Sequence, residues 1–259
     1  MEVLARCFIV EPRDYHDNSI ILLHGRGSNG KDFASELFEC SILLGNSQET
    51  SLPQRFPNTR WIFPNAKLCY FTRFQEEMTE WFDIYSLTYP DERFELQKDG
   101  LIDTINLLSQ LVQIETRTIS SRKVIIRGIS QGFAVSALAL LSLDIGFGGL
   151  LGLSGWLPLT EAIGHCTTPA EVTTQLGKTL SLDLPNRLDG NSSWVSTPIF
   201  IGHEENDAVV DCDLGKAAFE KFRNWGAKVE WHTYDSADHW IQEPDEIKDI
   251  ADFISRCMH

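Results

Sequence analysis

The chain has 259 residues, of which 42% are hydrophobic and 23% charged, so it carries ample apolar material for a globular core. Its net charge of −15 argues against a nucleic-acid partner, because phosphate binding needs a basic face. The same charge argues mildly against constitutive docking on anionic lipid. At this length the chain forms one large α/β domain or two small ones.

The six cysteines, at positions 7, 40, 69, 166, 212 and 257, are scattered. This spacing is neither that of a zinc site nor that of a dense disulfide scaffold. The amino terminus lacks a basic region followed by a long apolar stretch, so we expect no secretory signal. Val135 to Leu159 contains one charge, Asp144, but its glycines favour a buried helix and strand over a membrane span. We therefore expect a soluble cytoplasmic protein with reduced cysteines and no stable membrane anchor.

Apolar runs alternate with amphipathic segments along the chain. In chain order we predict strand Arg6–Val10, strand Ser19–His24, helix Lys31–Leu44, strand Arg60–Phe63, helix Gly100–Thr116, strand Lys123–Arg127, helix Gln131–Ser142, strand Gly149–Ser154, strand Thr197–Gly202, helix Asp213–Trp225, strand Lys228–Tyr234 and helix Glu243–Cys257. Continuous Ile/Val/Leu runs are typical of strands buried on both faces, and their alternation with helices predicts a mainly parallel sheet between helical layers. With no visible repeat or linker, residues 1–259 are predicted to form one domain.

Two segments interrupt the alternation. Residues 66–92 are loop-like but rich in aromatic side chains, and residues 160–196 are rich in Thr, Ser, Asn, Gly and Pro. Long loops in a compact domain are usually functional or mobile, and ligands of such sheets lie beyond the carboxyl ends of the strands. The aromatic residues therefore either fill a core or, as we favour, form a pocket wall.

The sharpest motif is Gly128-Ile129-Ser130-Gln131-Gly132, which follows a β-branched run and precedes a helical segment. This pattern predicts a strand that turns tightly into a helix and exposes Ser130 at the carboxyl end of the sheet. A serine hydroxyl is a poor nucleophile at neutral pH, so Ser130 needs a base and a group that orients the base.

In the hydrolase version of this sheet, the acid and then the histidine follow later strands. Asp207 and His239 occupy these two corners, so we assign them as acid and base. The rival histidines are His203, His24, His232 and His165, and the rival acids are Asp211, Glu204 and Glu205.

The Ser19–His24 strand ends in His24-Gly25-Arg26-Gly27, a glycine-lined exit. The backbone N–H groups of Arg26 and Gln131 are predicted to bind the oxyanion, with their side chains incidental. The alternative is a tight turn without a catalytic role.

Further motifs accompany the serine turn and the His24-Gly25-Arg26-Gly27 exit, and together they span nearly the whole chain. These further motifs are Phe63-Pro64-Asn65-Ala66, Trp81-Phe82-Asp83, Ser154-Gly155-Trp156-Leu157-Pro158, Asp207-Ala208-Val209-Val210 and Asp238-His239. In all of these motifs the sequence resembles the acyl-protein thioesterase / phospholipase–carboxylesterase family of α/β-hydrolases. The resemblance implies that fold, with a mainly parallel central sheet and helices on both faces. It also implies serine-dependent hydrolysis of a carboxylic ester or thioester, with Ser130, Asp207 and His239 as the triad.

The resemblance further implies an acyl channel between the aromatic loop and the turn after residue 154. Its predicted substrate-binding residues are Phe71, Phe74, Trp81, Phe133, Trp156 and Leu157. Arg127 and Phe133 depart from the family pattern, which usually has small residues there. Arg127 either binds an acidic substrate group or forms a structural ion pair, and Phe133 either narrows the pocket or packs beneath the sheet. Residues 160–196 look longer than in compact family members and are predicted to form a cap-like insertion.

The expected chemistry is two-step acyl transfer without a metal or organic cofactor. The expected substrate is a lipid or small-molecule acyl ester or thioester, or an S-acylated protein. Two alternatives remain open. A specialised-metabolite enzyme could use the same triad for acyl transfer, cyclisation or carbon–carbon bond cleavage, and a hydrolase scaffold could serve as a non-catalytic binding protein.

Overall fold

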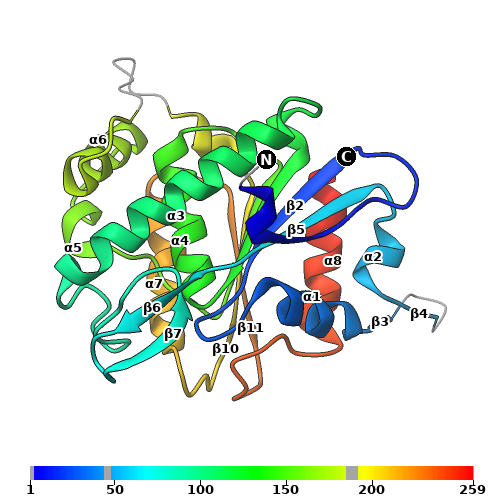
Figure 1. Cartoon of the computed structure of the whole chain (residues 1–259), viewed down its shortest axis with the longest axis horizontal. Helices are drawn as coiled ribbons and strands as arrows, with labels where there is room; N and C mark the ends of the chain where they lie inside the picture. Colours follow the sequence, from blue (N-terminus) through cyan, green and yellow to red (C-terminus); the bar gives the residue numbers. More distant parts are fainter. Residues whose placement is uncertain (1–2, 44–47, 185–191, 259) are drawn as a thin grey trace.

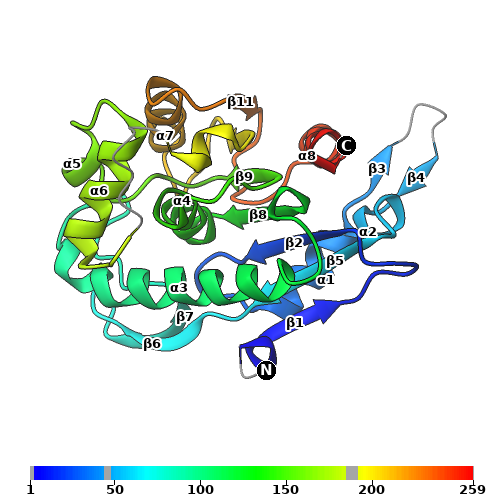
Figure 2. The same cartoon turned by 90° about the horizontal axis from the view of Figure 1, so that it is seen from above.

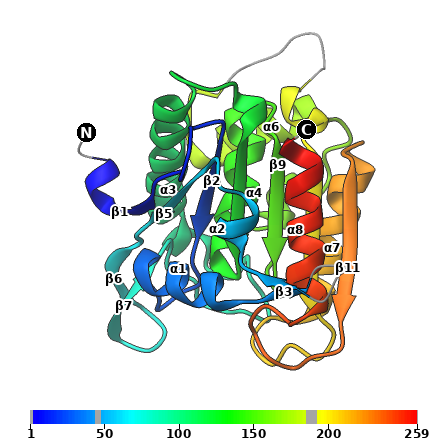
Figure 3. The same ribbon diagram turned by 90° about the vertical axis from the view of Figure 1, so that its right-hand side faces the viewer.

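A seven-stranded sheet forms the centre of the molecule, in the order β1-β5-β2-β8-β9-β10-β11. The structure, a computed structural model, describes residues 3–43, 48–184 and 192–258. All neighbouring strands of the central sheet are parallel except β1 and β5, and Figure 3 shows the arrows of β2, β9 and β11 pointing to the same edge. The strands are β1 (Cys7–Val10), β2 (Asn18–Leu23), β5 (Thr59–Pro64), β8 (Val124–Ile129), β9 (Gly149–Leu153), β10 (Ile199–Glu204) and β11 (Val229–Tyr234).

Helices cover both faces of this sheet. Helices α1 (Gly30–Glu39) and α8 (Asp245–Met258) lie on one face, and α3 (Phe94–Glu115), α4 (Gln131–Leu143) and α7 (Cys212–Asn224) lie on the other (Figures 1 and 2). The shorter elements are η1 (Leu4–Arg6), β3 (Ile42–Leu43), β4 (Glu49–Thr50), α2 (Leu52–Arg55), η2 (Ser121–Lys123), α5 (Thr160–Ile163), α6 (Pro169–Leu180) and η3 (Ser193–Ser196).

The central strands β2, β8, β9 and β10 are buried along their whole length because both faces of the sheet are covered. Every residue of β2 is buried, with Ile21 and Leu23 facing the α3/α4 side and Ile20 and Leu22 facing the α1/α8 side. Helix α4 is buried at nearly every position, since it packs against the sheet, α3 and α6. Within the described ranges, no helix combines the length and the apolarity needed to cross a membrane.

Every predicted strand and helix is present, with shifted ends. The helix predicted from Lys31 ends at Glu39, and Leu44, the predicted end, lies outside the described residues. The helix predicted from Gly100 begins at Phe94. Gly100 looked like a helix start, but it lies inside α3 because a Cβ there would stand 2.6 Å from the Cα of Phe82. A tertiary contact, rather than a helix boundary, explains this glycine.

The aromatic segment 66–92, which was expected to be a loop, contains a β-hairpin. Strands β6 (Lys67–Phe71) and β7 (Glu76–Glu80) pair antiparallel and project beside the carboxyl edge of the central sheet (Figure 1). Its sequence lacks a strong strand signal because the hairpin has little buried surface: Leu68 and Tyr70 are exposed. The turn has no glycine either, and Gln75 adopts the positive φ of 56°.

Most of the predicted insertion 160–196 is helical. Thr168 caps α6 by accepting a hydrogen bond from the Glu171 N–H, and Pro169 begins the helix. Helix α6 packs against α4, where the Thr173 hydroxyl donates to the Leu141 carbonyl at 3.0 Å. The described residues of the predicted insertion therefore extend the helical layer. Residues 185–191 of this insertion lie outside the described residues.

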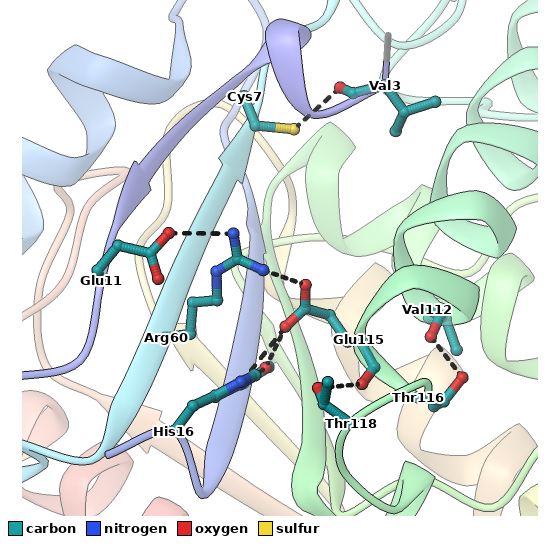
Figure 4. A network of polar contacts seen from close by, with 10 residues as sticks. Val3, Cys7, Glu11, His16, Arg60, Val112, Glu115, Thr116 and Thr118 are labelled. Carbon is teal, nitrogen blue, oxygen red and sulfur yellow. Dashed lines mark hydrogen bonds and ion pairs between the residues drawn. The ribbon is translucent and has the colours of Figure 1, made fainter. Parts of the chain in front are cut away.

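A buried ion pair joins α3 to the amino ends of two strands, opposite the carboxyl edge. Glu115 is fully buried and accepts hydrogen bonds from Arg60 Nη1 at 2.7 Å and from the Ser19 hydroxyl at 2.6 Å (Figure 4). Ser19 and Arg60 are register neighbours on β2 and β5. His16 lies 3.5 Å from the same carboxylate, and exposed Glu11 contacts the other side of the guanidinium. One carboxylate thus connects the last turn of α3 to the sheet.

Candidate active site

The predicted serine turn is formed between β8 and α4. Ser130 has φ 55° and ψ −125°, a strained conformation for a residue with a side chain. The backbone on both sides requires glycine: a Cβ on Gly128 would stand 2.2 Å from the Gly132 carbonyl, and one on Gly132 would stand 2.3 Å from the Leu23 carbonyl oxygen. The turn therefore presents Ser130 at the amino end of α4, where the helix dipole favours negative charge.

Asp207 and His239 meet beyond the last two strands. Asp207 follows β10, His239 follows β11, and His239 Nδ1 lies 2.7 Å from Asp207 Oδ2. Because the carboxylate can only accept, Nδ1 carries the proton and Nε2 is the basic nitrogen. The rival acids have other partners: Asp211 caps α7, Glu204 accepts from the Ser154 hydroxyl, and Glu205 accepts from the Thr233 hydroxyl.

The Asp207 carboxylate is held ionised by its surroundings. Burial by itself raises the pKa of Asp207, but hydrogen bonds from His203, His239 and the backbone N–H groups of Val210 and Val209 outweigh it, and the pKa lies well below its ordinary value. The Val209 and Val210 N–H groups both donate to Oδ1, at 2.8 and 3.0 Å respectively. A permanently negative Asp207 is suited to orient and stabilise a charged imidazole.

Ser130 and His239 line the same cleft, which has a volume of about 490 Å³. Within residues 3–43, 48–184 and 192–258, neither His239 Nε2, which is buried, nor the Ser130 hydroxyl has a hydrogen-bond partner. Catalytic hydrogen bonds often tighten only when substrate is bound. The geometry therefore brings the three predicted triad residues to one rim.

The two predicted oxyanion donors line this cleft too. In the part of the chain that is described, neither the Arg26 N–H nor the Gln131 N–H donates to a protein acceptor, whereas the Gly27 N–H donates to the Thr79 carbonyl. His24 fixes the strand exit: its Nδ1 lies 2.7 Å from the Gly25 carbonyl, and its Nε2 accepts from the Ala66 N–H. Two free N–H groups beside Ser130 can bind a developing oxyanion.

The Gln131 side chain is not incidental, in contrast to the prediction. Its Oε1 accepts from the Trp81 N–H at 2.9 Å, and its Nε2 donates to the Phe82 carbonyl at 2.6 Å. The Trp81 indole donates in turn to the His24 carbonyl. These bonds fix the segment after β7 against the Ser130 turn and the strand exit at His24, a role that only the tertiary contacts reveal.

Of the predicted substrate-binding residues, Trp156 lines the cleft. The structure places the others elsewhere: Phe71 is buried beneath Arg26, Phe74 lies exposed on the hairpin, Trp81 packs against His24 with tilted rings, and Leu157 and Phe133 are buried in the core of the α3/α4 face. The apolar wall of the cleft is instead formed by the aliphatic residues Ile84, Leu87, Ile129 and Val209, which gave no aromatic signal in the sequence. Two aromatic residues of other elements, Phe33 and Trp240, complete this wall.

The two departures from the family pattern lie behind the site rather than in it. The Phe133 ring packs beneath β9, where a Cβ on Gly152 would stand 2.2 Å from it. Arg127 is fully buried, and its nitrogens have neither an acceptor nor an ion-pair partner among the described residues. Its guanidinium lies 5.8 Å from the Phe33 ring centroid, and burial lowers its pKa to about 10, so it stays charged near neutral pH. Neither predicted role of Arg127 is seen.

The remaining rival histidines make contacts with residues other than Ser130. His232 faces Glu230 and Asp249, and His165 lies beside α6. His203 contacts the Asp207 carboxylate from inside the protein. Among the described residues, no three His, Cys, Asp or Glu side chains come together in a way that could hold a metal ion.

The carboxyl group of Glu80 is buried at the end of β7. Glu80 is 1% exposed, and neither of its oxygens has a hydrogen-bond partner among the described residues. The pKa of Glu80 is raised to about 8, mainly by burial and also by the nearby Asp83 carboxylate, while Arg26 opposes the rise. Glu80 is therefore mainly protonated at neutral pH.

This carboxyl group predicts a pH-dependent stability. The unfolded chain loses the Glu80 proton near its ordinary pKa of about 4.3, whereas the folded chain keeps it to about 8. The contribution of Glu80 to stability is thus fully present below its unfolded-state pKa and falls by a few kcal/mol as the pH rises through this window. Urea unfolding between pH 5 and 8 should show this fall in the wild type, and less of it in Glu80→Gln. Equal slopes for the two proteins would contradict the prediction.

The mainly parallel sheet, the sharp strand–serine–helix turn and the Asp–His pair after the last strands define the α/β-hydrolase fold. The solved structure of Zea mays acyl-protein thioesterase 2 has the same fold, with a TM-score of 0.73 at 22% identity over 98% of this chain and 99% of that one. The model of the phospholipase/carboxylesterase family matches residues 4–180 and 179–258. The chain belongs to this family, and it is a carboxylesterase-type hydrolase, which confirms the predicted fold and family.

Curated relatives of similar length support this assignment. Acyl-protein thioesterase 1 of Debaryomyces hansenii is 30% identical over 241 residues, covering 92% of this chain and 90% of the relative. Acyl-protein thioesterase 1 of Saccharomyces cerevisiae is 28% identical over 245 residues, covering 93% of this chain and 92% of the relative. The similarity therefore extends over almost the whole of each protein.

Proposed function

We propose that this protein cleaves carboxylic esters or thioesters by two-step acyl transfer, with Ser130 as nucleophile, His239 as base and Asp207 as the orienting acid. One observation carries the proposal: His239 is bound through Nδ1 to Asp207 at 2.7 Å, while its unpartnered Nε2 belongs to the cleft that Ser130 lines. This is the arrangement that activates an alcohol at neutral pH.

In the proposed first step, His239 Nε2 takes the proton of Ser130 as the hydroxyl oxygen attacks the substrate carbonyl. The N–H groups of Arg26 and Gln131 donate to the resulting oxyanion, and the dipole of α4 favours the same charge. His239 then protonates the leaving alcohol or thiol, and an acyl-enzyme remains on Ser130. Water, activated by His239, releases the acid. These steps require no metal or organic cofactor.

The proposed substrate is an acyl ester or thioester of a lipid, a small molecule or an S-acylated protein. The names of the curated relatives favour a thioester. The apolar residues that line the cleft, among them Phe33, Ile84, Leu87 and Trp156, are suited to an acyl chain. We further propose a cytoplasmic location, which is supported by six free cysteines, two of them buried.

A fluorophosphonate probe tests the proposal, because it phosphonylates only an activated serine. We expect wild-type protein to be labelled and Ser130→Ala to remain unlabelled. Absence of labelling in folded wild type would favour a non-catalytic binding protein. Labelling without turnover of short p-nitrophenyl esters or acyl thioesters would favour acyl transfer, cyclisation or carbon–carbon cleavage.

A further inference from the structure

The Asp207 carboxylate faces a second imidazole from inside the protein. His203 lies on β10, four residues before Asp207, and its side chain is completely buried. Its Nε2 lies 3.0 Å from the Val210 carbonyl oxygen and 3.4 Å from Asp207 Oδ2. Oδ2 is also the atom that lies 2.7 Å from His239 Nδ1. One carboxylate oxygen is therefore shared by two histidines.

The partners of His203 determine its tautomer. A backbone carbonyl and a carboxylate both only accept hydrogen bonds, so Nε2 must carry the proton. The opposite nitrogen, Nδ1, has no hydrogen-bond partner within the described ranges and packs against α7, where a Cβ on Gly215 would stand 2.3 Å from it. Trp231 covers the ring at a centroid distance of 6.2 Å. The ring is held by packing so that a single N–H points at the acid turn.

We propose that His203 is a positioning residue for the proposed triad: its Nε2–H holds the Asp207–Val210 turn and withdraws part of the charge of Oδ2 from His239. The inference rests on the proposed function of Asp207 and His239. It completes a set of four donors around one carboxylate, since Val209 and Val210 occupy Oδ1 and the two imidazoles share Oδ2.

Among the described residues, no basic side chain other than these two imidazoles contacts the Asp207 carboxylate. The thiol of Cys212, at the start of α7, lies near Asp207 and also near the carboxylates Glu205, Asp211 and Asp213. Burial, with these carboxylates and Asp207, raises the pKa of the Cys212 thiol to about 11, so it is uncharged near neutral pH. From the other side only His239 reaches the carboxylate. The His203 N–H is thus the internal counterpart of the His239 N–H.

The proposal predicts a shift in the pH profile with a definite sign. Without the His203 N–H, Oδ2 keeps more negative charge and stabilises protonated His239 more strongly. The base then stays protonated to a higher pH, so the acidic limb of kcat/KM moves up, by about half a pH unit for one lost hydrogen bond. Loosening the Asp207–Val210 turn should also lower kcat/KM at the pH optimum roughly tenfold. This loss is smaller than the hundredfold loss, roughly, that a 1 Å misplacement of a catalytic group can cause.

Two substitutions at this position separate the hydrogen bond from the packing. His203→Phe keeps an aromatic ring but loses the donor, and we expect both the shifted limb and the loss of kcat/KM. His203→Gln keeps an N–H donor at a similar distance, and we expect it to restore most of both. Gly215→Ala, which leaves His203 intact but forces its ring to move, should resemble His203→Phe.

The readouts include one that does not depend on turnover. NMR titration of the His239 ring in wild type and in each variant should show the same upward shift as the kinetics. An unchanged midpoint in folded His203→Phe, or a His203→Gln variant as impaired as His203→Phe, would overturn the inference. If wild type lacks Ser130-dependent activity but the NMR midpoint still moves, the proposed function fails and the coupling of His203 to His239 stands.

Discussion

Ser130→Ala should lower kcat on an ester or thioester substrate by a factor of about 10⁵ or more, because removing the nucleophile leaves only binding and oxyanion stabilisation. The turn that presents Ser130 depends on Gly128 and Gly132 rather than on the serine hydroxyl, so the variant should fold normally. Stopped-flow measurement of the acyl-enzyme burst and steady-state turnover, with circular dichroism as a check on folding, would measure the loss.

Matched control variants test whether the loss of kcat is specific to Ser130. Ser35 is exposed on α1, where its hydroxyl donates to the Lys31 carbonyl, so Ser35→Ala should leave kcat unchanged. On the acid loop, Asp207→Asn should cost about 10⁴-fold by favouring the wrong His239 tautomer. Asp211→Asn changes only the cap of α7 and should cost little. Comparable kcat values for Ser130→Ala and wild type would remove the nucleophile from the proposal, and a larger effect of Asp211 than of Asp207 would reassign the acid.

The second large effect is expected on stability, at the opposite edge of the sheet. Glu115→Ala should lower the free energy of unfolding by about 3–5 kcal/mol, because it leaves the Arg60 charge without its buried partner and the Ser19 hydroxyl without its acceptor. Figure 4 shows the Glu115 carboxylate pointing at Arg60, with His16 beside it. Urea denaturation at neutral pH would measure the change.

The same guanidinium provides the control. Glu11 contacts Arg60 at 3.0 Å but is 64% exposed, so Glu11→Ala should change stability by about 0.5 kcal/mol or less. The double variant Arg60→Met/Glu115→Met should be more stable than Glu115→Ala, because it leaves no uncompensated charge. If the two single variants lost equal stability, burial would not be the source of the Glu115 effect.

Residues with strong local signals were predicted closely. The β-branched run before Gly128 specified a buried strand, the two glycines around Ser130 specified the turn, and the order of the strands predicted that Asp207 and His239 follow β10 and β11. These predictions succeeded because backbone sterics and hydrophobic period act over a few residues and leave a pattern in the sequence. The resemblance to the family rested on the same local motifs.

Features made by contacts between distant segments were not predicted. The β6–β7 hairpin has little buried face of its own, and Gly100 marks an approach to Phe82 rather than a helix end. The aromatic residues Phe71 and Trp81 suggested a pocket wall, but the cleft is lined by Ile84 and Leu87 instead. Aromatic composition does not show which way a side chain points, and that direction depends on packing.

The sequence by itself determined the class of sheet, the position of Ser130 and the pairing of Asp207 with His239, because each follows from short-range backbone geometry and from the order of strands. Only the tertiary structure decided which residues line the cleft, that the Gln131 side chain fixes the segment after β7, and that His203 shares the Asp207 carboxylate. These contacts join segments that no local pattern relates, and they exist only once the apolar faces of β2, β8 and their neighbours have been buried.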